Sequence, residues 1–201
     1  MALTLEELLQ GNALIPSVSD TAQLKYAVKE QDFPCIMVKT GDISTIASIL
    51  KLIHNAGKRA MVHLDSLKGI ARDKEGIHYL KRIGTDSLIT MKPQTIRIIK
   101  DSGIFSLLGT FLVDSASVKS AIQNVHTNKP DALILMPMTI PEETYRYVLN
   151  HVDIPLIAGG LGLSVEIITR ALSQGLAACA VTDPEVLKRT QQILQRSGQQ
   201  L

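Results

Sequence analysis

The sequence predicts an α/β fold, a compact TIM-type (βα)8 barrel, from three observations. Short β-branched runs recur roughly every 20–25 residues, helical apolar stripes fill the gaps, and two successive units near the end carry turns suited to phosphate. Parallel strands joined by helical crossovers wind into an open sheet or close into a barrel, and eight units favour closure. Because 201 residues is short for such a barrel, a seven-stranded or partly open version is the alternative.

The expected strands are short and nearly all apolar, which is typical of parallel strands covered on both faces. They are 13–18, 35–38, 60–64, 87–90, 104–113, 132–136, 155–158 and 178–181. No linker or low-complexity tract interrupts them. We therefore expect one domain, 1–201, preceded at 1–12 by a short N-terminal helix.

Apolar residues at helical spacing predict the intervening helices. Such stripes lie at 43–53, 77–83, 96–99, 145–149, 163–172 and 186–194. Gly57 and Gly84 are expected to end the first two, and Pro93 suits the first turn of the third. Thr139 and Glu142 have the spacing of a capping box ahead of the fourth.

The composition is that of a cytoplasmic protein with no membrane partner. Hydrophobic residues make up 45% of the chain, enough to bury a core without a disulfide or a metal ion. Cys35 and Cys179 lie in apolar runs, so we expect buried thiols, and no spacing predicts a metal site or a cofactor. The N-terminus carries Glu6 and Glu7 but no basic leader, and no apolar run approaches the ~20 residues of a membrane span.

The charge pattern does not by itself predict a nucleic-acid partner. The formal net charge is only +2, and aromatic residues make up 3% of the chain. Basic pairs such as Lys58-Arg59 and Lys188-Arg189 mostly fall at helix ends, where the helix dipole explains them.

Polar residues cluster where the strands are expected to end, which is the functional edge of such a barrel. The candidate ligand-binding residues are Lys39, His63, Asp65, Lys92, Asp114, Pro137, Gly159, Gly160 and Thr182. Together they predict a cup with two lysines, a histidine, aspartates and a glycine-lined phosphate cradle.

The cradle is predicted from Gly159-Gly160, which stand between a buried strand and a helix start. Bare backbone N–H groups there, with a helix dipole behind them, favour a phosphate. Thr182 follows the neighbouring strand, so we expect the three residues to converge on one anion. The alternative is that both glycines merely permit a tight turn.

His63 and Asp65 alternate with Met61, so all three are expected to face one side of a strand, inward. The histidine and the carboxylate could orient a ligand hydroxyl, act as a general base, or pair with each other as a polar plug. Lys39 and Lys92 could neutralise a phosphate, form a Schiff base if buried, or simply be solvated.

Three aspartates precede expected helices. Asp114 and Asp183 are most simply N-caps, whereas Asp42 could also hold Lys39 in place. The loops 66–73 and 114–117 are the expected moving parts.

Five blocks of residues, 40–43, 57–69, 111–115, 130–132 and 155–161, suggest a family. Their order and spacing resemble the glycerol-3-phosphate-responsive antiterminator family over roughly residues 35–190. The resemblance implies a small barrel that binds sn-glycerol 3-phosphate and then acts on the RNA leader of glycerol-utilisation messages to prevent early termination. It implies a regulator and not an enzyme.

The chain departs from the family pattern inside the cup. Leu108-Gly109 stand in place of a Gln-Arg pair, and Ile134 in place of a Glu. Other replaced positions are Met138, Met91, Ala180 and Val181. Losing a basic and an acidic partner together is a compensated removal of charge or a sign of a changed ligand.

Two other classes of function stay open. One is a lyase or isomerase acting on a phosphorylated metabolite, with His63 or Asp65 as base and Lys39 or Lys92 as its partner. The other is a diverged scaffold whose surfaces bind another protein. A homo-oligomer is compatible with each.

Overall fold

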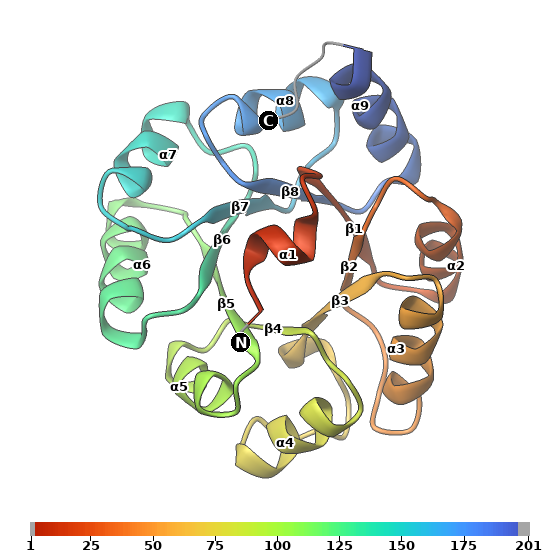
Figure 1. Cartoon of the computed structure of the whole chain (residues 1–201). Helices are drawn as coiled ribbons and strands as arrows, with labels where there is room; N and C mark the ends of the chain where they lie inside the picture. Colours follow the sequence, from red (N-terminus) through yellow and green to blue (C-terminus); the bar gives the residue numbers. More distant parts are fainter. Residues whose placement is uncertain (1–2, 197–201) are drawn as a thin grey trace.

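Eight parallel strands form a closed barrel in sequence order (Figure 1). The computed structural model describes residues 3–196; the parts of the expected domain and N-terminal helix at 1–2 and 197–201 lie outside the described residues. The strands are β1 Leu14–Val18, β2 Cys35–Val38, β3 Arg59–His63, β4 Ser87–Thr90, β5 Phe105–Phe111, β6 Ala132–Met136, β7 Leu156–Gly159 and β8 Ala178–Val181. Pairing of β1 with β8, Leu14 opposite Cys179, closes the barrel. The (βα)8 prediction is confirmed, and the seven-stranded or partly open alternative is wrong.

Eight helices follow the strands and surround the barrel (Figure 1). They are α2 Thr21–Lys29, α3 Ile46–Asn55, α4 Lys74–Arg82, α5 Pro93–Asp101, α6 Ser115–Asn128, α7 Glu142–Leu149, α8 Val165–Leu172 and α9 Pro184–Arg196. A 3-10 turn, η1 Leu64–Ser66, comes directly after β3. The helices bury their apolar faces against the outer faces of the strands in two clusters.

The helix starts follow the sequence signals with one exception. Asp114 is the N-cap of α6, and the Asp183 carboxylate accepts from the first amides of α9, as predicted. The predicted capping box at Thr139 is wrong. The N-cap of α7 is Pro141, which makes no side-chain hydrogen bond, so Thr139 stands two residues too early to cap a helix that begins at Glu142.

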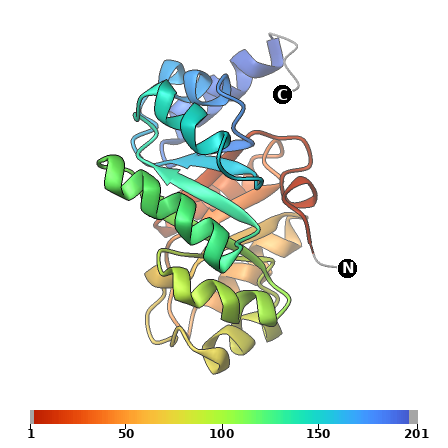
Figure 2. The ribbon, with the colours of Figure 1, turned by 90° about the vertical axis from the view of Figure 1, so that its left-hand side faces the viewer.

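A short helix, α1 Leu5–Leu9, closes the amino end of the barrel. It lies over the barrel in the middle of Figure 1 and on one side of it in Figure 2. Leu5, Leu8 and Leu9 join inward-facing strand residues such as Ile15 and Phe105 in one buried cluster. The barrel interior is therefore a packed core, and the carboxyl end is where a ligand can approach.

Cys35 and Cys179 are buried free thiols, as expected. Within residues 3–196, no helix is both long and apolar enough to cross a membrane.

Candidate functional site

His63 points toward the inside of the barrel at its carboxyl end. Met61, two positions earlier in β3, belongs to the inner core cluster. Because side chains alternate along a strand, His63 takes the same inward direction. The expected inward orientation of His63 is thus confirmed.

Asp65 does not continue that strand, which ends at His63, so the expected alternation is wrong at this residue. Its carboxylate accepts from Thr90 Oγ1 at 3.0 Å, from Met91 N at 2.6 Å and from Arg72 Nε at 2.5 Å. Asp65 therefore ties the end of β3 to the end of β4 and to the loop that carries Arg72. Burial acts to raise the pKa of Asp65, but these hydrogen bonds outweigh it and lower the pKa.

The predicted polar plug of His63 with Asp65 is replaced by other partners. His63 Nδ1 lies 3.2 Å from Ser66 Oγ, and the Asp65 carboxylate acts on the imidazole only through its charge. Burial is the main cause that lowers the pKa of His63, the charge of Lys39 lowers it further, and Asp65 opposes both. At neutral pH the imidazole is therefore neutral and can both donate and accept.

Lys39 lines a cavity of about 540 Å³ that lies between α2 and α3, beside the loops that follow β2 and β3. The other polar lining residues include Thr40, Asp42, Thr45, Ser48, Ser66 and Lys68. None of the ion pairs within residues 3–196 includes Lys39, and burial lowers its pKa. Among the described residues, the charge of this half-buried lysine therefore has no carboxylate partner, and a bound anion would compensate it.

Asp42 does not hold Lys39, contrary to one of the sequence alternatives. Its carboxylate accepts from Ser44 N at 2.9 Å and from Thr45 N and Oγ1, both at 2.9 Å. These local bonds lower the pKa of Asp42 and shape the turn before α3.

The glycine turn after β7 lies on the other side of the cup. Gly160 has φ +71° and the following Leu161 has φ +55°, so a tight left-handed turn does require the glycine. Gly160 C=O accepts from Met138 N at 2.8 Å. A Cβ placed on Gly159 would be 3.4 Å from Met136 Cγ, so this methionine packs beside the turn.

The two helices next to this turn already have side-chain caps. Ser164 Oγ accepts from Ile167 N at the start of α8, and the Asp183 carboxylate accepts from Glu185 N and Val186 N at the start of α9. Asp183 thus brings a negative charge next to Thr182. Convergence of Gly159, Gly160 and Thr182 on one anion stays a prediction.

Two methionines that the sequence reasoning did not select fill the apolar side of the cup. A Cβ placed on Gly109 would lie 2.4 Å from Met91 Sδ and 3.4 Å from Met136 Cε. Ile134 is buried beside Gly159. Apolar packing therefore occupies Gly109 and Ile134, the two positions at which the family pattern has a basic and an acidic residue. The sequence signal that could have identified Met91 is its alternation with Ile89, which faces the inside of the barrel.

The remaining candidates lie at the edge of the cup. Lys92, Asp114 and Thr182 are exposed, the first two as N-caps of α5 and α6. Pro137, half-buried, has its Cα 3.9 Å from where a Cβ on Gly160 would be. Residues 114–117, expected as a loop, form the N-cap and first turn of α6. No group of three or more His, Cys, Asp or Glu side chains in the described part of the chain could hold a metal ion.

The structure thus defines a (βα)8-barrel protein with a polar cup at the carboxyl ends of β2 and β3. Residues 14–187 match the family described as glycerol-3-phosphate responsive antiterminator. A protein of Escherichia coli K12, the uncharacterized protein YgcP, is 32% identical over 193 residues, which are 96% of this chain and 100% of that protein. The chain belongs to the glycerol-3-phosphate responsive antiterminator family.

Two solved structures confirm the fold. The glycerol uptake operon antiterminator regulatory protein of Listeria monocytogenes superposes with a TM-score of 0.82 and 21% identity, covering 88% of this chain and 95% of that one. An antiterminator-related protein of Thermotoga maritima superposes with a TM-score of 0.78 and 23% identity, covering 88% and 98%.

Proposed function

We propose that this protein is a cytoplasmic regulator that binds sn-glycerol 3-phosphate, or a similar small phosphorylated ligand, and acts on an RNA leader to prevent transcription termination. The observation that carries the proposal is the family match over 14–187, which runs from β1 into α9 and includes the whole cup. Fold alone would not distinguish a regulator from an enzyme.

The proposed ligand site uses the chemistry at the carboxyl end of the barrel. Lys39 supplies a half-buried positive charge without a carboxylate partner, and neutral His63 can hydrogen-bond a hydroxyl. Asp65 keeps the end of β4 in place through Thr90 and Met91. The other proposed ligand-binding residues are Lys92, Asp114, Pro137, Gly159, Gly160 and Thr182.

One observation favours a second candidate, a lyase or isomerase. Burial lowers the pKa of Lys39, which is a condition for a lysine that forms a Schiff base. Against it, the Asp65 carboxylate is held by three donors and its pKa is lowered, so it is a weak base. Treatment with borohydride in the presence of a phosphorylated carbonyl compound would trap an adduct on Lys39 only if the enzyme proposal is correct.

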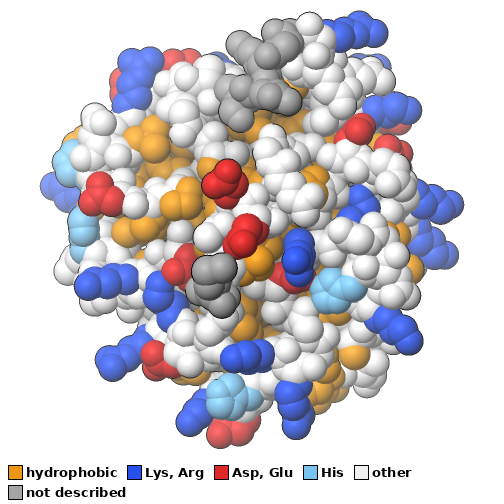
Figure 3. Space-filling model, in the orientation of Figure 1, with side chains coloured by type: hydrophobic (Ala, Val, Ile, Leu, Met, Phe, Trp, Pro, Cys, Tyr) orange, Lys and Arg blue, Asp and Glu red, His pale blue; other side chains and the backbone are white. Residues whose placement is uncertain are grey.

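The proposal of an RNA partner rests on the family match alone. On the amino face, Lys and Arg side chains are spread around the edge over the outer helices and do not gather into one patch (Figure 3). A net charge of +2 adds little general attraction for a polyanion.

The test combines ligand binding with RNA binding. Glycerol 3-phosphate should raise the melting temperature of the full chain, since binding to the native state stabilises it by mass action. Lys39→Met should abolish that rise, whereas Lys51→Met, an exposed lysine on α3, should not. Binding of a structured leader RNA should require the ligand and weaken with salt. Turnover of the ligand without RNA binding would favour the enzyme proposal. Binding of neither the ligand nor the RNA would favour a diverged scaffold that binds another protein.

A further inference from the structure

Large apolar side chains are exposed to solvent at the carboxyl end of the barrel. At the end of β5 Phe111 is 60% exposed, and in the connection to α6 Val113 is 79% exposed. In the connection from β7 to α8, Leu161 and Leu163 are 53% and 69% exposed. Single exposed apolar residues need no explanation, but several at one end of a molecule mark an interaction surface.

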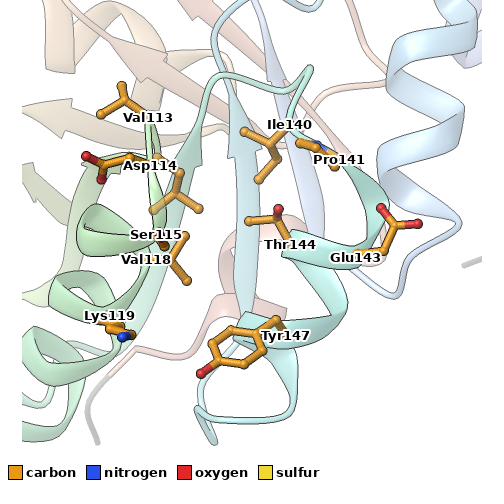
Figure 4. A pocket seen from close by; sticks show the side chains of 11 residues that line it. Val113, Asp114, Ser115, Val118, Lys119, Ile140, Pro141, Glu143, Thr144 and Tyr147 are labelled. Carbon is orange, nitrogen blue, oxygen red and sulfur yellow. The ribbon is translucent and has the colours of Figure 1, made fainter.

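Of these residues, Val113 also lines a groove of about 540 Å³ between α6 and α7. Figure 4 shows Val113 and Val118 on the α6 side and Ile140, Pro141 and Tyr147 on the α7 side. Tyr147 is 46% exposed and stacks on His151 with ring centroids 4.2 Å apart. Exposed aromatic and aliphatic side chains of this kind are typical of the centre of a protein–protein interface.

Side chains of both charges flank the groove. Lys119 projects from α6 and Glu143 from α7 (Figure 4), and both are exposed. Within the described residues 3–196, neither takes part in an ion pair. Asp114 adds a second acidic group on the α6 side, so the groove does not suit a polyanion.

We propose that a second copy of this chain binds on this face. A two-fold axis running along the groove would set α6 of each copy against α7 of the other. Lys119 of each copy then faces Glu143 of the other, and the contact forms twice, as a two-fold symmetric interface requires. Val113 and Tyr147 contribute apolar contacts at the two ends of the groove (Figure 4). The proposal does not depend on which ligand the cup binds.

Sedimentation equilibrium on the full chain tests this assignment. We expect a mass twice the 21.9 kDa of one chain. Val113→Asp should give a monomer because it places a carboxylate where an exposed apolar side chain contacts the second copy. Lys119→Glu and Glu143→Lys should each weaken the dimer about tenfold, because one reversal sets two like-charge contacts into the symmetric interface. The double variant Lys119→Glu/Glu143→Lys should recover the affinity.

The control is Leu52→Asp, which changes an exposed leucine on α3, 42% exposed and away from the groove, and should stay dimeric. Circular dichroism of each variant checks that the fold is kept. A wild-type chain that is monomeric at all concentrations overturns the proposal. So does a dimer that Val113→Asp leaves intact, or one in which the double charge reversal fails to restore what the single reversals lose.

Discussion

The carboxylate of Asp65 provides the sharpest test of how the cup is held together. Replacing Asp65 with Ala removes the acceptor of three hydrogen bonds, from Thr90 Oγ1, Met91 N and Arg72 Nε. The Thr90 side chain and Met91 N then lose a charged partner in a site where water reaches poorly, since the Asp65 side chain is only 14% exposed.

The expected loss of stability is about 3 kcal/mol. A hydrogen bond to a charged group contributes about 1.5–3 kcal/mol, and two of the three donors are shielded. The bond from Arg72 adds little, because that side chain is 40% exposed and solvent screens the pair. For a chain of this size, about 3 kcal/mol corresponds to a fall in melting temperature of roughly 6–12 °C.

Urea unfolding followed by circular dichroism measures the change. Asp114→Ala is the matched control, since it removes an exposed N-cap aspartate and should cost clearly less stability than Asp65→Ala. Because the folded-state pKa of Asp65 lies below its unfolded value, its contribution is present above the unfolded pKa and is lost as the pH falls through the folded pKa. The wild type and Asp65→Ala should therefore converge in acid. A loss no larger than that of Asp114→Ala would refute this account.

Three further predictions concern the glycine of α4, the imidazole and the anion. Gly76→Ala should destabilise the fold although Ala favours helices, because the new Cβ would lie 2.0 Å from Ala71 O; equal or greater stability in thermal unfolding would contradict the packing. His63 should titrate below the ordinary value of about 6.5 in an NMR pH series, since burial disfavours the imidazolium; a midpoint above it would contradict the neutral assignment. Lys39→Met should weaken inorganic phosphate binding in calorimetry, because it removes the half-buried positive charge; unchanged affinity would contradict the role of Lys39.

The barrel itself was determined by local sequence. Eight short apolar runs predicted eight strands, and most bounds agree within one residue, because a strand buried on both faces must be apolar along its length. β5 is the exception, ending at Phe111 before the exposed Val113. The apolar stripes did not mark helices α2 and α6. In each of them one of the two buried residues is an alanine, Ala27 or Ala121, whose small side chain marks a stripe weakly.

The partners within the cup were decided by the tertiary structure. His63 could be placed from its alternation with Met61, but the bonds of Asp65 to Thr90 and Met91 join residues 25 and 26 positions apart. Whether Met91 fills the space over Gly109 depends on how β4 and β5 pair in the closed barrel. Secondary structure follows from periodicity along the chain, whereas the charge left unpaired at Lys39 and the volume filled by Met91 depend on which strand ends closure brings together.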